Sequence, residues 1–130
     1  MQYSLYGENQ SKTFYASSLY VEKERVMITD TQDYLDTDGC WEEYFIIKPE
    51  LFQKLLDKLS SLYKPSTVEE LDNNAKAVYD SLEDDTLKML FLHIHHLAKC
   101  GPNRFHGLEL VEKICGSDIP FEKSVYSKGP

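Results

Sequence analysis

The sequence predicts an α+β fold in which an N-terminal antiparallel sheet of three to four strands packs against three to four C-terminal helices. Two observations indicate this fold class. Apolar and polar residues alternate in short runs before Lys48, which is the pattern of half-buried strands. After Pro49 the apolar residues adopt the spacing of amphipathic helices. Strands that precede helices, rather than alternating with them, indicate an α+β arrangement.

The first 29 residues predict a weak strand followed by a hairpin. Tyr3 and Leu5 alternate with polar residues before a turn-forming cluster at residues 7–11. Residues 18–21 and 25–29 then flank a charged tract, which is typical of a hairpin with a solvated tip.

Residues 30–43 form the most charged segment of the chain. The Asp38-Gly39 dipeptide favours a turn. No Lys or Arg occurs in the segment, which carries six acids: Asp30, Asp33, Asp36, Asp38, Glu42 and Glu43.

A third strand is predicted over residues 41–47. Alternation places Tyr44 and Ile46 on one face of this strand, and Trp41, Glu43, Phe45 and Ile47 on the other. Because neither face is wholly polar, we expect a central strand that is covered on both sides.

A helix of about 14 residues should follow Lys48 and pack against the sheet. Pro49 suits the first turn of a helix, and Pro65 ends the pattern because proline disfavours helical geometry in the preceding residue. The apolar stripe is Leu51, Phe52, Leu55, Leu56, Leu59, Leu62 and Tyr63.

Three further helices are predicted in the second half of the chain. Ser66 and Glu69 have the spacing of a capping box, and the more convincing helix that follows covers residues 75–82. A long apolar helix is expected over residues 86–100 and a short one over residues 108–115. The tail, residues 119–126, forms either an edge strand or a segment draped over the core.

The length of 130 residues predicts a single domain over residues 1–130. The net charge of −8 argues against nucleic acid as a direct partner, because binding to phosphates depends on Lys and Arg. It favours a basic protein partner, or else serves only solubility. No secretion signal and no long apolar run is visible, and the three cysteines are scattered, so we expect a cytoplasmic protein with no membrane contact.

The sharpest candidate for chemistry is a cluster of His93, His96 and Cys100, to which His106 could fold back. Imidazole and thiolate are zinc ligands. The spacing matches no established zinc signature, however, so we expect packed or solvent-facing histidines and no metal. The adjacent Glu42 and Glu43 would point to opposite faces of a strand, and no phosphate-binding loop or nucleophile elbow occurs. We therefore expect no catalytic residues, no cofactor and no enzymatic activity.

The acidic segment also carries aromatic residues. Tyr34, Trp41 and Tyr44 lie among its carboxylates, a mixture suited to binding a basic surface, since aromatic rings supply contact area and acids complement Lys and Arg. The alternative is a solvated loop whose aromatic residues turn inward.

A family resemblance adds to these patterns. The strand W-E-E-Y-F-I-I leads into K-P-E-L-F-Q-K-L-L-D-K-L, after a hairpin and a polar loop. This succession, over residues 19–62, resembles the small acidic immunity proteins of bacterial contact-dependent growth inhibition and related polymorphic toxin systems. In those proteins a strand of the form d-x-E-Y-x-x-x-I feeds a helix rich in L-x-x-L-L-x-x-L, which corresponds here to residues 42–59.

The resemblance implies a cytoplasmic antidote that binds a cognate toxin domain, often a basic nuclease, and covers its active or substrate-binding surface. On this hypothesis the partner contacts are Asp33, Asp36, Asp38, Glu42 and Glu43, with Tyr34 as an anchor; the helical faces around residues 72–74 or 83–85 are the alternative surfaces. Two other functions stay open: a phage-type inhibitor of a host defence nuclease, and a small zinc-dependent enzyme that uses His93, His96, Cys100 and His106. The oligomeric state is not predicted.

Overall fold

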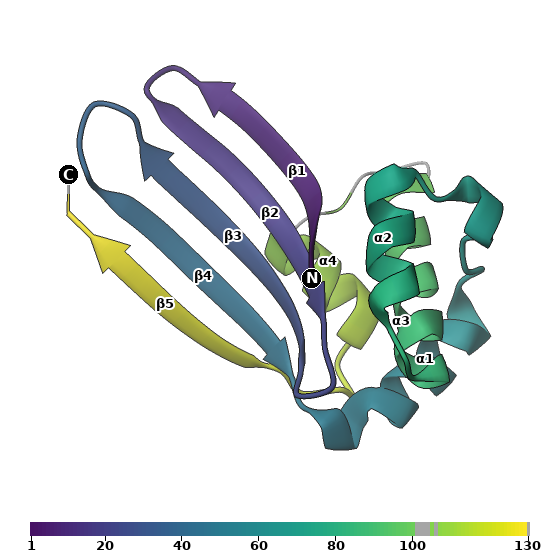
Figure 1. Ribbon diagram of the computed structural model, residues 1–130. Helices are drawn as coiled ribbons and strands as arrows, with labels where there is room; N and C mark the ends of the chain where they lie inside the picture. The colour runs from purple at the N-terminus through teal and green to yellow at the C-terminus, as the bar shows by residue number, and fades with distance from the viewer. Residues whose placement is uncertain (101–104, 106, 130) are drawn as a thin grey trace.

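The computed structural model of the chain describes residues 1–100, 105 and 107–129. Within these residues four strands precede the helices, and a fifth strand follows them (Figure 1). In chain order the elements are β1 (Gln2–Gln10), β2 (Thr13–Val21), β3 (Val26–Tyr34), β4 (Cys40–Ile47), the 3₁₀ turn η1 (Pro49–Leu51), α1 (Phe52–Leu62), the 3₁₀ turn η2 (Val68–Glu70), α2 (Asn73–Ser81), α3 (Asp85–His95), the π-helical turn η3 (His96–Cys100), α4 (Gly107–Cys115) and β5 (Glu122–Lys128).

The strands form one antiparallel sheet in the order β1-β2-β3-β4-β5. The α+β class is confirmed, but the prediction of three to four strands is wrong, because the described chain has five. The added strand is the C-terminal tail, which pairs with β4 as an edge strand. Every residue of β5 is exposed, so no burial pattern marks it in the sequence. Lys123 and Lys128 on this edge disfavour pairing with another chain.

The first three strands are longer than their apolar patterns indicate. Gly7 lies inside β1 opposite Ala16 rather than in a turn, and the chain reverses at residues 11–12 instead. Pairing of β2 with β3 continues from Val21–Val26 out to Thr13–Tyr34. Backbone hydrogen bonds extend these strands beyond the point where their side chains stop alternating in polarity.

The core lies between the sheet and the helices. The strand register brings Tyr3, Leu19, Ile28 and Phe45 into one row across the sheet. None of the four side chains is more than 3% exposed. Burial of each large apolar side chain contributes on the order of 1.5–3 kcal/mol. The helices cover this row with Leu55, Leu59, Leu90, Phe91, Leu110 and Ile114, all 0% exposed.

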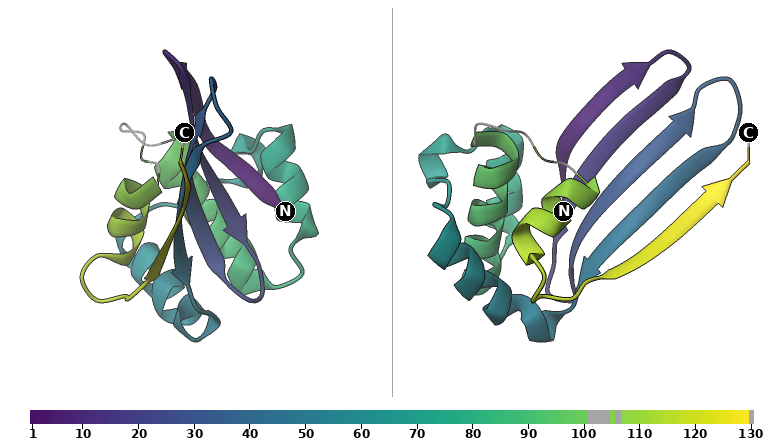
Figure 2. Two further views of the ribbon diagram at one scale, coloured as in Figure 1. Left: turned by 90° about the vertical axis from the view of Figure 1, so that its left-hand side faces the viewer. Right: turned by 180° about the vertical axis from the view of Figure 1, so that it is seen from behind.

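The helices cover only part of the sheet. The views in Figures 1 and 2 show α4 lying against β3 and β4, while the hairpin ends at residues 11–12 and 35–39 extend away from all of the helices. We call residues 6–17, 30–43 and 125–128 the projecting half of the sheet. Among the described residues, only α4 reaches this half, at Asp30 on its inner border. The half carries the acidic segment singled out in the sequence.

β4 lies between β3 and β5, so it is an inner strand. The predicted sharing of a face by Trp41, Glu43, Phe45 and Ile47 agrees with the register, since Phe45 and Ile47 are both 1% exposed. The expectation that both faces are covered is wrong: Tyr44 and Ile46 are only half-buried.

The predicted helix after Lys48 is confirmed, with its first turn in 3₁₀ form over Pro49–Leu51. Phe52, Leu55 and Leu59 are its buried residues, while Leu62 at its end is 57% exposed. The stripe therefore narrows toward the C-terminal end of α1, where the helix leaves the core.

The capping box lies one residue later than predicted. Glu70 accepts hydrogen bonds from the Thr67 amide (3.0 Å) and hydroxyl (3.1 Å). Ser66 instead is buried, with its Oγ 2.7 Å from Nδ1 of His95. Asp72 and Asp84 cap α2 and α3 by accepting from the amides of Ala75 (2.7 Å) and Leu87 (3.1 Å).

Two histidines of α3 lie in the core. His93 is 2% exposed and His95 is 3% exposed. Burial lowers the pKa of each imidazole below its usual value, because the interior disfavours the charged form. Both side chains are therefore neutral packing residues.

The free energy of unfolding should fall as the pH drops from about 6.5 to about 5, above the range where carboxylates titrate. In this window the unfolded chain binds protons at His93 and His95 and the folded protein does not, so the stabilisation is complete above pH 6.5 and is lost as the pH falls. Urea unfolding at several pH values measures this slope. His95→Asn, which retains a polar partner for Ser66, should reduce this dependence of the unfolding free energy on pH. A free energy of unfolding that stays constant between pH 6.5 and pH 5 would contradict the prediction.

Candidate functional site

The six predicted contact residues lie at the same end of the sheet but on different faces. Tyr34 and Glu43 share the side of Ile28 and Phe45, which faces the helices in the packed half. Asp33 and Glu42 alternate to the outer face, and the turn after β3 carries Asp36 and Asp38. The structure therefore brings these residues together around the β3–β4 hairpin end, not on one flat surface.

The helix-side face of the projecting half is hollowed. A depression of about 460 Å³ extends across β1, β2, β3 and β4. Its floor follows the register rows Tyr15–Gln32–Trp41 and Ser17–Asp30–Glu43. The residues that give it chemical character are Tyr6, Tyr15, Asp30, Gln32, Trp41 and Glu43. The depression thus combines three aromatic rings with two carboxylates.

Trp41 and Glu43 form a hydrogen-bonded pair in the depression. The indole Nε1 of Trp41 donates to Oε1 of Glu43 over 2.9 Å. Lys123 of β5 places its Nζ 3.6 Å from Oε2 of the same carboxylate, which is 22% exposed. The pair fixes the orientation of the indole while its ring remains only half-buried. A ring held in this way is suited to anchoring a partner.

Asp30 has a structural role at the inner border of the depression. Its carboxylate accepts hydrogen bonds from the Ser17 hydroxyl and from the Leu108 amide (3.3 Å). The carboxylate thereby lies at the first turn of α4, where a negative charge is favoured by the helix dipole. Asp30 joins the sheet to α4 and is less available to a partner than the other acids of the segment.

The remaining acids differ in their availability. Glu42 accepts a hydrogen bond from the Tyr44 hydroxyl on the outer face, and this hydrogen bond raises the pKa of Tyr44 to about 12. Asp36 pairs with Lys12 over 2.9 Å, but both side chains are exposed, so the pair contributes little to stability. Asp33 and Asp38 are exposed.

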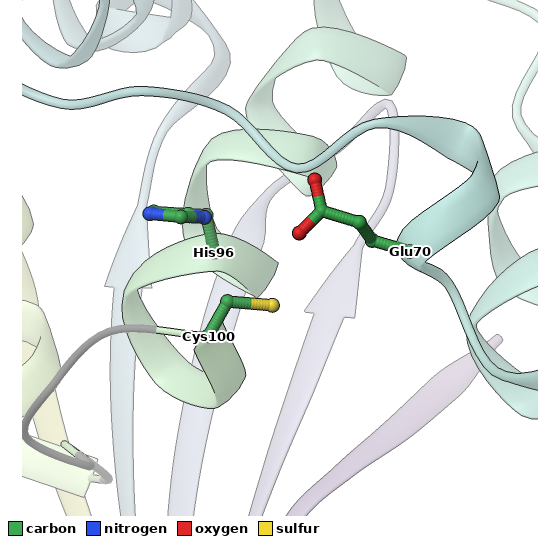
Figure 3. Close-up of side chains that lie close together, drawn as sticks. All are labelled: Glu70, His96 and Cys100. Carbon is green, nitrogen blue, oxygen red and sulfur yellow. The ribbon is translucent and has the colours of Figure 1, made fainter.

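The histidine and cysteine residues form a different cluster from the one predicted. One ligand atom each of Glu70, His96 and Cys100 lies within 4.8 Å of the other two (Figure 3). His93 is not part of this group, because it is buried with Nε2 3.4 Å from Oγ of Ser60. His106 lies outside the described residues. The predicted cluster of His93, His96, Cys100 and His106 is therefore wrong at His93. Glu70, and not His93, lies beside His96 and Cys100.

Sequence reasoning missed both Glu70 and the tyrosines of the depression. Glu70 reaches the cluster only because η2 lies beside the end of α3, which no local pattern indicates. Tyr15 had a usable signal, since it stands two residues before Ser17 and four before Leu19 on the same face of β2. No sequence pattern placed Tyr6 on this face, because β1 changes register between Ser4 and Tyr6 and simple alternation is interrupted there.

Comparisons of the chain with protein-family models, with curated proteins and with solved structures found no significant match. No helix in the described part of the chain has the length and apolar character needed to cross a bilayer. The chemistry of the two sites consequently rests on their own residues.

Proposed function

We propose that this protein is a cytoplasmic immunity protein, without enzymatic activity, that neutralises a cognate basic toxin domain by covering its active or substrate-binding surface. The observation that carries this proposal is the projecting half of the sheet, which presents an aromatic depression and an acidic hairpin end. Among the described residues, no helix covers them beyond the contact of α4 with Asp30. A nuclease toxin fits these features best, because its substrate groove must itself be basic to bind phosphates.

The charge of the projecting half supports a basic partner. Seven acids lie in it against two lysines, Lys12 and Lys128, so most of the net charge of −8 is concentrated here. Complementary fields of this kind steer association and reject partners of like charge. The seven acids are Glu8, Asp30, Asp33, Asp36, Asp38, Glu42 and Glu43.

The shape of the projecting half supports insertion into a groove. Asp33 and Glu42 lie on one face of the β3–β4 hairpin, and Tyr34 and Glu43 lie on the other. A flat partner surface could contact only one of these faces. A groove that receives the hairpin end would contact both, with Asp36 and Asp38 at its bottom and Trp41 against its wall.

Reversing three charges at the hairpin end tests this function. The variant Asp33→Lys, Asp36→Lys, Asp38→Lys should bind the toxin domain encoded directly upstream at least about 100-fold more weakly. This loss corresponds to about 2.8 kcal/mol in total, and single close charge pairs couple by about 1.5–7 kcal/mol. The probe is that domain carrying a substitution that abolishes its toxicity. Calorimetry at two salt concentrations measures both the affinity and its salt dependence.

A matched control separates the local surface from the net charge. The exposed acids Glu24, Asp57 and Glu112 lie outside both the projecting half and the alternative surfaces at residues 72–74 and 83–85, and their replacement by lysine changes the net charge by the same amount. This control should retain most of the affinity. Equal losses in both variants, or none in either, would contradict the assigned surface. An absence of any toxin gene upstream would favour the phage-type inhibitor of a host nuclease, which uses the same chemistry.

A further inference from the structure

The side chains of Glu70, His96 and Cys100 converge from two elements that are separate in the sequence. Glu70 belongs to η2, whereas His96 and Cys100 begin and end the π-helical turn η3 (Figure 3). One ligand atom from each residue lies within 4.8 Å of the other two. π-Helical turns are rare and are often found at functional sites. This cluster lies outside the projecting half of the sheet.

Glu70 and His96 each have a donor atom available. Oε1 of Glu70 accepts from the Thr67 amide and hydroxyl, which orients the carboxylate and leaves Oε2 for another ligand. Nδ1 of His96 is buried and has no hydrogen-bond partner among the described residues. An unpaired buried nitrogen is costly, and a metal ion would satisfy it.

The donor set selects the ion. One nitrogen, one sulfur and one oxygen suit Zn²⁺, whereas Ca²⁺ and Mg²⁺ require oxygen ligands. Zinc bond lengths place neighbouring ligand atoms roughly 3.3–3.7 Å apart, so two atoms at the 4.8 Å limit of the cluster would approach each other by about 1 Å when zinc binds. Glu70 and Cys100 are exposed and can make this movement by side-chain rotation.

We propose that Glu70, His96 and Cys100 form a zinc-binding site that links η2 to the C-terminal end of α3. Water completes the coordination, as in zinc sites with three protein ligands. The ion joins two segments that also meet at Ser66, whose amide donates to the Leu92 carbonyl (3.0 Å) and whose Oγ lies 2.7 Å from His95 Nδ1 and 3.8 Å from Cys100 Sγ. Zinc therefore stabilises the folded protein, and the stabilisation rises with the logarithm of the free zinc concentration once this exceeds the Kd.

Titration of the reduced, tag-free protein with Zn²⁺ and with Co²⁺ tests this site. We expect one equivalent of Zn²⁺ to bind and Co²⁺ to show a sulfur-to-metal charge-transfer band. Cys100→Ser should abolish the band, and Cys100→Ser and Glu70→Gln should each weaken zinc binding at least about tenfold. Gln at position 70 can still accept from Thr67, so the capping box is preserved.

Cys40→Ser is the matched control, because Cys40 lies at the start of β4 in the projecting half. It should leave the charge-transfer band, the affinity and the zinc-induced rise in melting temperature unchanged. An absence of zinc binding, or zinc binding that survives Cys100→Ser and Glu70→Gln, would overturn the proposal. The toxin-binding surface is not involved in these measurements, so either proposal can fail while the other stands.

Discussion

Replacement of Gly107 by alanine should lower the free energy of unfolding by about 3 kcal/mol. Gly107 begins α4 with a φ of +56°, a conformation that costs a residue with a Cβ roughly 1–2 kcal/mol. A Cβ at this position would also overlap the Asp30 carboxylate, and overpacking adds about 1–3 kcal/mol. Urea-induced unfolding measures the loss.

A second variant separates these two causes. In an Asp30→Ala background the overlap is removed, so Gly107→Ala should cost only the backbone part, roughly 1–2 kcal/mol. Gly129→Ala is the control, because a Cβ there meets nothing within 4 Å, and it should leave stability unchanged. The same cost for Gly107→Ala in both backgrounds would show that the Asp30 carboxylate does not restrict this position.

The substitution Phe91→Ala should destabilise the protein by about 3–5 kcal/mol, which is the usual range for deleting a buried phenylalanine ring. Phe91 is 0% exposed. Its ring meets that of Tyr3 edge to face, with centroids 5.7 Å apart and planes at 81°, and lies 6.1 Å from that of His95. Loss of the ring leaves a cavity where α3 holds β1 against the core.

The position of Tyr3 makes this cavity difficult to close. Its hydroxyl donates to Asp72 over 3.0 Å, so the ring is held between β1 and the start of α2. Met89→Ala on the same helix is the control for helix propensity, because Met89 is 36% exposed, and it should cost less than about 1 kcal/mol. Guanidinium unfolding of both variants gives the comparison. A similar cost for the two would indicate that the core collapses around position 91.

Apolar periodicity predicted the packed half of the fold well. Leu55 and Leu59 of α1, and Phe45 and Ile47 of β4, are buried as their spacing indicated. Periodicity failed at Asp30–Tyr34 and in the tail over Glu122–Lys128, which are strands without an alternating pattern. Alternation arises only where one face of a strand is buried, and in the described part of the chain the helices reach these segments only at Asp30.

The candidate sites were predicted in composition but not in arrangement. Alternation correctly separated Glu42 from Glu43, because neighbouring strand residues face opposite sides. It could not place Tyr15 and Tyr6 beside Trp41, since that depends on the register of three strand pairs. Alternation also could not show that Glu70, rather than His93, lies beside His96 and Cys100, because this depends on how η2 packs against α3.

The sequence by itself determined that the protein is acidic, that its fold is α+β, and that helical structure begins at Pro49, because charge and periodicity are properties of neighbouring residues. Only the tertiary structure decided that the sheet projects beyond its helices, that the acids surround both faces of a hairpin, and that Glu70 joins His96 and Cys100. These features depend on contacts between residues far apart in the chain, and local patterns carry no record of such contacts.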